Sequence, residues 1–383
     1  MGVGFLKKIS VKIEKRQNRI FSYPVAEQKK YVEKFPKPSD NFERSYFQYC
    51  CQMKLYGKPL HFLLNCAALP VSLFYLFKFK KCNTEFTESA DAVFFHGEKP
   101  ENIIPISLRD RFKNIVPSSA DRHSLTEDDI KFLKKLFIRF PLSWFLWLKC
   151  IIKISQYSSA VSEYAPKAII SCDEFSFTSS VLTEYCHTKN VSLINIMHGE
   201  KLYFMRDSFV NYDEFFVWSK AYADLFISLR ASKDQFKIEV PPSLLIKENG
   251  SICKKYDFTY YLASEKTDEL REIGKNLSIL KNHGLKIAVR PHPRYSDTEE
   301  IKQIFKFADI EDTEKITIEE SLLQTENAVS LYSTVLNQAY HAGINIVIDD
   351  ISGSEKYAKL KELQYAMLSE KHTLLSETVK SSI

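Results

Sequence analysis

Residues 289–294 read Val289-Arg290-Pro291-His292-Pro293-Arg294 and follow directly on the apolar run 285–289. That run predicts a buried strand, and the two prolines end the strand and stiffen the turn after it. The imidazole of His292 is therefore expected at the carboxyl end of a strand, between Arg290 and Arg294. In open α/β sheets, ligands bind outside the carboxyl ends of the strands. A cationic pocket there suits a phosphate or carboxylate; the alternative is a plain turn with a surface histidine.

Apolar runs and amphipathic segments alternate through most of the chain. We expect strands at 92–95, 167–171, 191–196, 215–218, 258–263, 285–289, 328–331 and 345–348. We expect helices at 177–188, 264–284, 316–324 and 333–341. This alternation predicts an α/β fold with parallel sheets covered by helices. At 383 residues the chain should form two domains, which we place at 1–218 and 219–383.

A second stretch, Ser330-Leu331-Tyr332-Ser333-Thr334, joins a predicted strand to a predicted helix. Backbone amides and hydroxyls at a helix N-terminus make an anion site without a lysine. A plain helix cap explains the hydroxyls equally well. Because this stretch and the His292 stretch both end strands of one predicted sheet, we expect them at the same edge.

A third stretch, Ser171-Cys172-Asp173-Glu174-Phe175, ends a strand in the preceding half. One of two adjacent carboxylates in a tight loop can be desolvated and act as a general base. Capping of a helix start is the alternative. The motif His198-Gly199-Glu200 follows one strand later, and Gly199 permits a close approach of the backbone. Glu200 and Glu98 are the next candidates for the base.

The charge is unevenly distributed along the chain. Residues 1–81 carry 16 Lys and Arg against 5 Asp and Glu, about +11, whereas the net charge of the whole chain is +5. The basic part contains the apolar segment 61–79, which Pro70 interrupts and which is short for a membrane span. Two interpretations stay open: an amphipathic region on an anionic membrane surface, or a core helix with a solvated basic flank. Nucleic-acid binding is not favoured, because the basic residues are not interleaved with a recognised motif.

The eight cysteines show no metal-ligand spacing, which favours reduced core thiols in a cytosolic protein. The first residues lack the apolar core of a signal peptide. No phosphate-binding glycine motif of the Walker or GxGxxG type occurs. Asp349-Asp350 is the nearest approach to an acidic metal motif, and we expect it to end a strand. We therefore predict neither a metal ion nor a bound cofactor.

The order of these motifs resembles a known group of enzymes. The motifs are Met197-His198-Gly199, Phe216-Val217-Trp218-Ser219, Arg290-Pro291-His292-Pro293, Tyr332-Ser333-Thr334-Val335-Leu336, Ala339 and Gly343. Together they resemble bacterial surface-polysaccharide glycosyltransferases of the GT-B fold, in which two Rossmann-like domains face each other across a cleft. The His-Pro motif followed by a Ser-Ser/Thr motif is similar to bacterial sialyltransferases and polysialyltransferases. Related patterns occur in Kdo transferases and teichoic-acid polyol-phosphate transferases. The resemblance covers about residues 165–350.

The resemblance implies roles for individual residues. His292 would contact the nucleotide phosphate and help the leaving group depart, and Ser333 and Thr334 would bind the donor's phosphate or carboxylate. Sialyltransferases carry a base motif of two acidic residues and a glycine, but here Asp173-Glu174 is followed by Phe175.

These observations predict an inverting, metal-independent glycosyltransferase whose donor is a nucleotide sugar, with CMP-sialic acid as the first choice. The predicted catalytic residues are Asp173, Glu174 and His292. The predicted donor-binding residues are Arg290, Pro293, Arg294, Ser333 and Thr334. His198, Gly199 and Glu200 are predicted to contact the acceptor or the donor.

The acceptor would be a glycan or a lipid-linked glycan. The enzyme would work in the cytoplasm, or peripherally on the inner face of the cytoplasmic membrane. The alternatives are a UDP-hexose transferase, a CDP-polyol phosphotransferase of the same fold, and a non-catalytic GT-B scaffold at the membrane.

Overall fold

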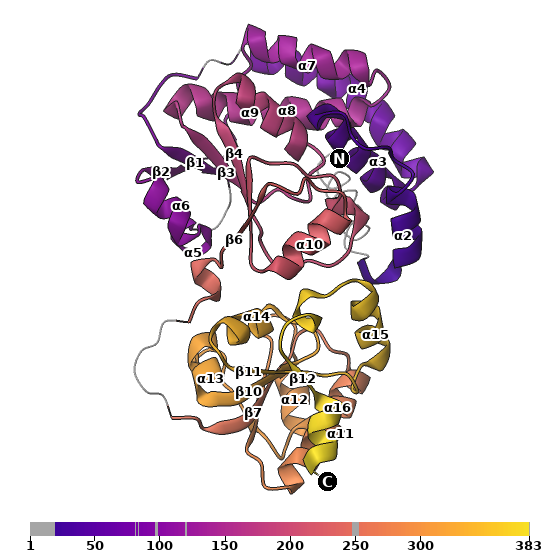
Figure 1. The fold of residues 1–383 in the computed structure, drawn as a ribbon, viewed down its shortest axis with the longest axis vertical. Helices are drawn as coiled ribbons and strands as arrows, with labels where there is room; N and C mark the ends of the chain where they lie inside the picture. Colours follow the sequence, from indigo (N-terminus) through magenta and orange to yellow (C-terminus); the bar gives the residue numbers. More distant parts are fainter. Residues whose placement is uncertain are drawn as a thin grey trace. The chain divides into compact units, whose positions relative to one another are not determined.

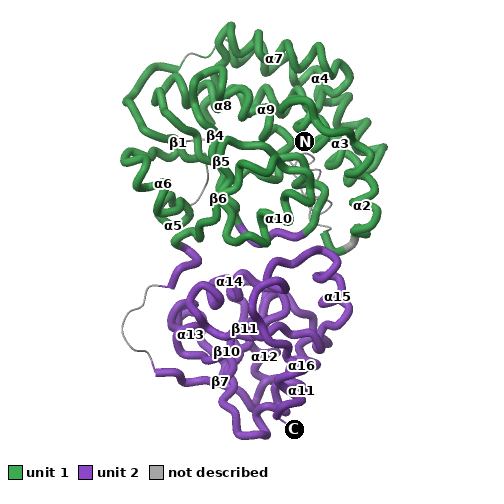
Figure 2. Tube along the Cα trace, viewed as in Figure 1, with its two compact units in different colours: residues 1–198, 203–242 green, residues 199–202, 243–383 purple. Residues whose placement is uncertain are grey.

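Both halves of the chain build a parallel sheet, which we describe from a computed structural model. The structure describes residues 20–80, 82, 84–95, 99–118, 121–246 and 253–382. The chain divides into two units (Figure 2). Unit 1 comprises residues 1–198 and 203–242, and unit 2 comprises residues 199–202 and 243–383.

The sheet of unit 1 has the strand order β2-β1-β3-β4-β5-β6 within the described residues (Figure 1). Every neighbouring pair is parallel. The strands are β1 (Ala92–Phe95), β2 (Ile115–Pro117), β3 (Ala168–Ser171), β4 (Ser192–Ile196), β5 (Glu214–Val217) and β6 (Phe236–Ile238). All residues of the central strand β3 are buried, as expected of a parallel strand covered on both faces.

Helices pack around this sheet, and three of those that the structure describes precede its first strand in the chain. They are α2 (Val25–Val32), α3 (Asn41–Tyr56), α4 (Lys58–Lys80), α5 (Pro100–Ile103), α6 (Ile106–Arg111), α7 (Glu127–Arg139), α8 (Trp144–Tyr164), α9 (Ser179–Thr188) and α10 (Lys220–Ser228). Short 3-10 helices lie at η1 (Ile20–Ser22), η2 (Met205–Asp207) and, at the junction of the units, η3 (Pro242–Leu244). Apolar side chains of α2 and α3 pack on the loop around η2.

The sheet of unit 2 has the order β12-β11-β10-β7-β8-β9 within the described residues, again with parallel neighbours only. Its strands are β7 (Tyr256–Tyr261), β8 (Ile287–Arg290), β9 (Asp309–Ile310), β10 (Thr325–Ser330), β11 (Asn345–Ile348) and β12 (Thr373–Leu374). Its helices are α11 (Thr267–Asn282), α12 (Thr298–Ile304), α13 (Ile318–Gln324), α14 (Thr334–His341), α15 (Ser354–Glu362), η4 (Ala366–Leu368) and α16 (Leu375–Ser382). Apolar side chains of α11, α12 and α16 form one core with β7, β8 and β10.

These observations confirm the predicted fold class, an α/β chain with two Rossmann-like units. The strands and helices expected in the sequence occur with small shifts at their ends. Leu270, Ile273, Leu277 and Leu280 are buried in α11 as their helical spacing predicts. Helix α11, however, begins at Thr267 rather than at residue 264, and the carboxylate of Glu269 accepts the backbone N–H of the N-cap residue Lys266.

The predicted domain boundary at 218/219 needs correction. Strand β6 pairs with β5, so α10 and β6 complete the first sheet and belong to unit 1. The division lies at 242/243 instead, and residues 199–202 belong to unit 2. Side-chain periodicity does not reveal this boundary, because β6 is a three-residue edge strand with a largely exposed pattern.

Helix α4 contains the apolar segment 61–79 and is not a core helix. It packs against α8 along one narrow face, where Ala68, Ser72 and Phe79 are buried. In the described part of the chain it is the helix that is long and apolar enough to cross a membrane, yet only 11% of its apolar window is buried. The interpretation as a core helix is therefore wrong, and membrane contact stays a prediction.

The cysteines are free thiols, and Cys51, Cys150, Cys172 and Cys186 are buried. Burial raises the pKa of Cys51 to about 12, which keeps this thiol protonated and unreactive at neutral pH. Cys66 and Cys253 are exposed, so the expectation of core thiols holds for half of the set.

Candidate functional site

The backbone after β8 holds the ring of His292 in one orientation. The backbone N–H of His292 donates to Ser296 Oγ at 2.8 Å, and the backbone N–H of Arg294 donates to His292 Nδ1 at 3.1 Å. The ring also stacks on Tyr295, with 4.5 Å between ring centroids. Because Nδ1 accepts a hydrogen bond, a neutral ring carries its proton on Nε2. His292 is therefore prepared to donate from Nε2 to a ligand.

The pKa of His292 lies below its ordinary value, first because of partial burial and second because of the charge of Arg294. Protonation would also cost the ring its Nδ1 hydrogen bond, so the geometry and the direction of the shift agree. Both features favour a ring that donates from Nε2.

Arg290 does not take part in this arrangement, although it lies two residues from His292. Its guanidinium donates to Glu311 Oε2 at 2.9 Å and to the backbone carbonyl of Ile316 at 2.8 Å, and the residue is only 8% exposed. Arg290 therefore has a structural role in unit 2, and its role in binding the donor stays a prediction. Pro293 and Arg294 are exposed beyond the strand, where a ligand can reach them.

Ser333 and Thr334 form the start of α14. Ser333 is the N-cap residue, and its Oγ accepts the backbone N–H of Val335 at 3.2 Å. Thr334 is exposed. The structure thus confirms the helix-cap interpretation of Ser333, and a cap leaves the anion-binding property of the helix N-terminus intact.

The His292 loop and the start of α14 lie at the same edge of one sheet, as predicted. β8 and β10 are both parallel neighbours of β7, so their carboxyl ends share an edge. Neighbouring strands lie about 4.8 Å apart, which puts these two ends on the order of 10 Å from each other.

The loop after β7 lies between them and contributes Glu265, which we did not single out from the sequence. Glu265 Oε2 accepts the backbone N–H of Ala263 at 2.7 Å, and burial raises the pKa of its carboxyl group. Glu265 and Asp349 line a small cavity of about 10 Å³ at this edge. The sequence shows Glu265 only as an acidic residue near a helix start; its place depends on the strand order.

Asp349 and Asp350 follow the end of β11 as predicted; Asp349 caps the next turn, and Asp350 binds the start of α16. Asp349 accepts the hydroxyl of Tyr260 at 2.8 Å and the backbone N–H of Ser352 at 2.8 Å. Asp350 accepts the backbone N–H of Ser376 at 2.9 Å. Among the residues that the structure describes, no group of three or more His, Cys, Asp and Glu is arranged to hold a metal ion.

The loop after β3, residues 172–175, contains Asp173 and Glu174, and we call it the acidic loop of unit 1. Its two carboxylates have different surroundings. Asp173 Oδ2 pairs with Lys153 Nζ at 2.9 Å and remains partly exposed. Glu174 is completely buried, and its Oε2 accepts the Nδ2 amide of Asn195 at 3.1 Å. Asn195 Oδ1 in turn accepts the backbone N–H of Asp173 at 2.8 Å. A substrate can therefore reach Asp173, whereas Glu174 acts within the protein.

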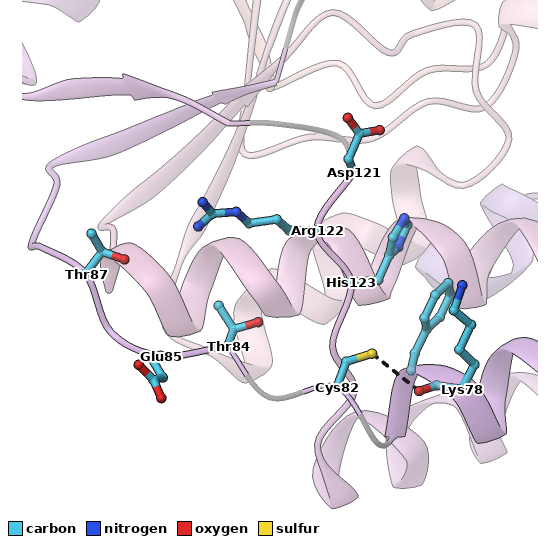
Figure 3. A pocket seen from close by; sticks show the side chains of 9 residues that line it. Lys78, Cys82, Thr84, Glu85, Thr87, Asp121, Arg122 and His123 are labelled. Atoms are coloured by element: carbon cyan, nitrogen blue, oxygen red, sulfur yellow. Dashed lines mark hydrogen bonds between the residues drawn. The ribbon is translucent and has the colours of Figure 1, made fainter.

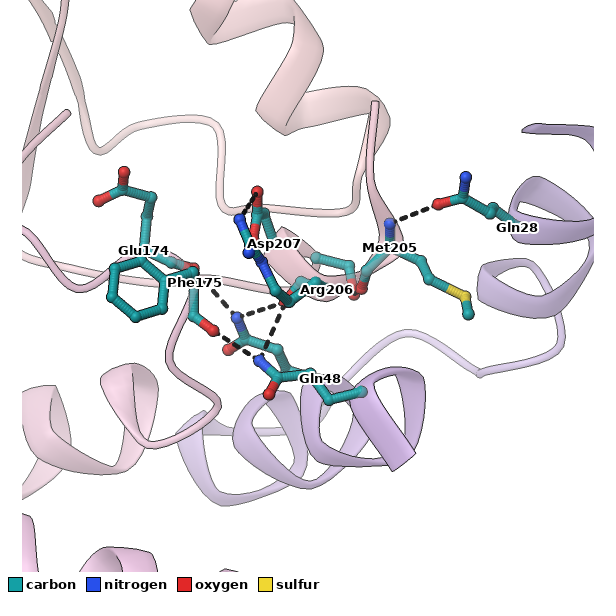
Figure 4. A network of polar contacts seen from close by, with 9 residues as sticks. Gln28, Gln48, Glu174, Phe175, Met205, Arg206 and Asp207 are labelled. Carbon is teal, nitrogen blue, oxygen red and sulfur yellow. Dashed lines mark hydrogen bonds and ion pairs between the residues drawn. The ribbon is translucent and has the colours of Figure 1, made fainter. Parts of the chain in front are cut away.

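Helix α3 supports the acidic loop from the side (Figure 4). Gln48 Nε2 donates to the backbone carbonyls of Glu174 and Arg206, at 3.1 and 3.0 Å. Gln52 Nε2 donates to the carbonyl of Phe175 at 2.5 Å. These amides join the acidic loop to η2, so the N-terminal helices position candidate catalytic residues. The sequence gives no sign of this, because the partners lie more than 120 residues apart.

The motif His198-Gly199-Glu200 is divided between the two units. His198 is exposed after β4 and belongs to unit 1. Glu200 belongs to unit 2, where its Oε2 accepts the Nδ2 amide of Asn337 in α14 at 2.8 Å. Gly199 has φ +72, and nothing lies within 4 Å of where its Cβ would be. Gly199 is therefore needed for its left-handed backbone conformation, and no other group that the structure describes approaches its backbone as closely as predicted. Glu98 lies outside the described residues.

Comparison with known proteins adds information on the fold alone. No family model and no curated protein matches the sequence. Among solved structures, UDP-GlcNAc 2-epimerase from Neisseria meningitidis bound to UDP-GlcNAc aligns with 9% identity over 67% of this chain and 81% of its own, with a TM-score of 0.41. HepE from Anabaena in complex with UDP and glucose aligns with 8% identity over 76% and 98%, with a TM-score of 0.39. The wall teichoic acid polymerase TagF aligns with 11% identity over 85% and 88%, with a TM-score of 0.43.

The structural role of Arg290 leads to a testable prediction about stability. Replacing Glu311 by Ala leaves a buried guanidinium without its charge partner, which typically lowers the free energy of unfolding by about 3–5 kcal/mol. The double replacement Arg290→Met and Glu311→Leu removes both charges and should recover most of that loss. Urea unfolding of the two variants measures the difference. Equal losses in the single and the double variant would contradict the assignment.

Proposed function

We propose that this protein is an inverting glycosyltransferase that uses a nucleotide-activated sugar and no metal ion. The single observation that carries the proposal is the ring of His292, which is held to donate from Nε2 at the sheet edge where α14 also begins. A donor phosphate at this edge would meet a neutral N–H donor, the exposed Arg294 and a helix N-terminus. Hydrogen-bond donors fixed before the reaction stabilise developing charge most effectively.

The base would come from the acidic loop of unit 1. Asp173 is the reachable carboxylate, and it forms an ion pair with Lys153 at 2.9 Å while its side chain stays partly exposed. The acceptor hydroxyl would lose its proton to Asp173 as its oxygen forms a bond to the anomeric carbon. The bond from that carbon to the phosphate oxygen would break, and its electron pair would leave on the nucleotide. Attack opposite the leaving group inverts the anomeric centre.

The donor we place first is CMP-sialic acid, and the acceptor is a glycan or lipid-linked glycan of a bacterial surface polysaccharide, in capsule or lipopolysaccharide synthesis. The support is the similarity of the His-Pro and Ser-Thr stretches to sialyltransferases. Phe175, where that family's base motif has glycine, is the specific observation that favours a second candidate. That candidate is transfer of a hexose from UDP or of a polyol phosphate from CDP by the same fold.

A thermal-shift screen of CMP, CDP, UDP and GDP tests the proposal. The nucleotide that matches the donor should raise the melting temperature, because it binds the folded state only. Slow hydrolysis of the matching donor without acceptor should accompany it, which a non-catalytic scaffold would not show. No stabilisation by any nucleotide would contradict the proposal.

Single replacements of Asp173 and Glu174 should distinguish a catalytic role of one carboxylate from a structural role of the other. Asp173→Asn should lower turnover by about 10²–10⁴-fold, the usual effect of losing a general base, with nucleotide binding unchanged. Glu174→Gln keeps an acceptor for the Asn195 amide and should act mainly on stability. Asp91→Asn is the matched control, because Asp91 also pairs with a lysine, Lys167, at 2.8 Å. Normal turnover in both acidic-pair variants would move the base elsewhere, with Glu200 next.

Replacement of His292 should affect the nucleotide side of the reaction. His292→Ala removes the Nε2 donor and should lower turnover by roughly 10²–10³-fold. It should also weaken binding of the nucleotide product by about 10- to 100-fold, the usual value of a hydrogen bond to a charged group. His292→Gln retains an N–H donor and should restore part of the binding but not the turnover.

Titration calorimetry with the product nucleotide and a turnover assay measure these effects. His283→Ala is the matched control, because His283 is an exposed histidine of the same unit. A folded His292→Ala protein that binds every nucleotide and turns over as the wild type does would overturn the assignment of the donor site.

A further inference from the structure

Helix α4 presents an apolar face to the outside of unit 1. We call this the outward face of α4, and its members are Phe62, Leu63, Val71, Leu73, Phe74 and Phe77. Phe62, Leu63 and Phe74 are 72%, 58% and 61% exposed. The buried residues Ala68, Ser72 and Phe79 recur at steps of four and seven, which is the opposite face of the same helix. A surface helix normally shows the reverse arrangement, with its apolar stripe toward the core.

We propose that the outward face of α4 lies flat on an anionic membrane surface, with the helix axis in the plane of the interface. Phenylalanine and leucine side chains on one face of a helix insert at the boundary of headgroups and acyl chains. This inference concerns where the protein works and does not depend on its being a transferase.

The contacts of α4 explain why it would lie on the membrane rather than cross it. Asn65 in the middle of the helix donates to the carbonyl of Leu142 at 2.6 Å and accepts the backbone N–H of Phe145 at 2.9 Å. Near its carboxyl end, Phe79 stacks on His123 with 4.4 Å between the ring centroids. A crossing helix would lose these contacts with the folded unit. Polar groups freed in the bilayer core are costly.

The charges on the helix select an anionic partner. Lys58 and Lys78 are exposed near its two ends, and the segment 58–80 contains no Asp or Glu. A symmetric contact between two copies of this face would bring like charges together without acidic partners. Cytoplasmic leaflets carry anionic lipids that attract such lysines. A membrane therefore fits the face better than a second copy of the chain does.

Neighbouring features extend the surface at both sides of the helix. Ile138 in the last turn of α7 and Leu142 in the loop before α8 are 80% and 73% exposed, and the bond from Asn65 places Leu142 beside α4. Lys78 borders a pocket of about 550 Å³ that His123 and Arg122 also line (Figure 3). Glu85 and Asp121 line the same pocket, so the positive charge of this surface comes from the helix lysines rather than from the pocket.

Vesicle binding by the full chain tests the apolar part of the proposal. The double variant Leu63→Gln and Phe74→Gln should bind vesicles of anionic phospholipid roughly 100-fold more weakly than the wild type, about tenfold for each apolar side chain removed from the interface. The matched control replaces Ile106 and Ile238 of the same unit by Gln, since both are exposed apolar residues outside α4. It should bind as the wild type does.

A second pair of variants tests the charge. Lys58→Gln with Lys78→Gln should weaken binding to anionic vesicles by roughly 20- to 30-fold, about fivefold for each lysine. The control Lys220→Gln with Lys275→Gln removes the same charge elsewhere and should have no such effect. Wild-type binding to neutral vesicles should be much weaker than to anionic ones.

Several results would overturn the proposal. One is a wild-type protein that binds neither kind of vesicle, or both equally. Another is an unchanged affinity of the Leu63 and Phe74 variant. A dimer in solution that this variant abolishes would assign the face to a second copy. Retention in membranes after an alkaline carbonate wash would assign α4 to a span.

Discussion

Parallel strand pairing is the constraint on which the candidate donor site depends. In a parallel sheet all carboxyl ends lie at one edge, so residues far apart in sequence are brought to one place. In unit 2 the register pairs Tyr261 with Arg290 and Ser330 with Ile348. The loops that follow these strands carry His292, Glu265, Ser333 and Asp349. Without this pairing the His-Pro turn would be a surface turn of no particular chemistry.

Burial then separates residues that look equivalent in the sequence. Arg290 is the last residue of β8 and is held inside by Glu311, whereas His292 lies beyond the strand with its ring partly exposed. The same division occurs in the acidic loop, where Asp173 is reachable and Glu174 is completely enclosed. Charge type alone therefore does not identify a ligand-binding residue. The buried member of each pair has its partners inside the protein, and the outer member is available to a substrate.

Local patterns allowed most of the fold to be predicted, because strand and helix periodicity are properties of neighbouring residues. The buried run before His292 and the leucines of α11 are examples. Properties that depend on strand order or on distant partners were not predictable. Glu265 gains its position only because β7 lies between β8 and β10. Gln48 reaches the acidic loop across 126 residues of sequence. The partner of Arg290 lies 21 residues away, on a strand end that no periodicity marks.

The exposed face of α4 is the clearest case in which composition and folded position differ. An apolar segment with a basic flank is compatible with a core helix and with a surface helix, and only tertiary packing decides between them. Here Ala68, Ser72 and Phe79 are buried on the inner face of the helix, while Phe62, Phe74 and Phe77 are exposed on the outward face. Burying a side chain as large as Phe74 in the core would stabilise the folded protein. In this fold, that stabilisation is available only when an external partner covers the side chain. If the proposed transferase acts on a lipid-linked glycan, the membrane surface that we propose for α4 would also carry its acceptor.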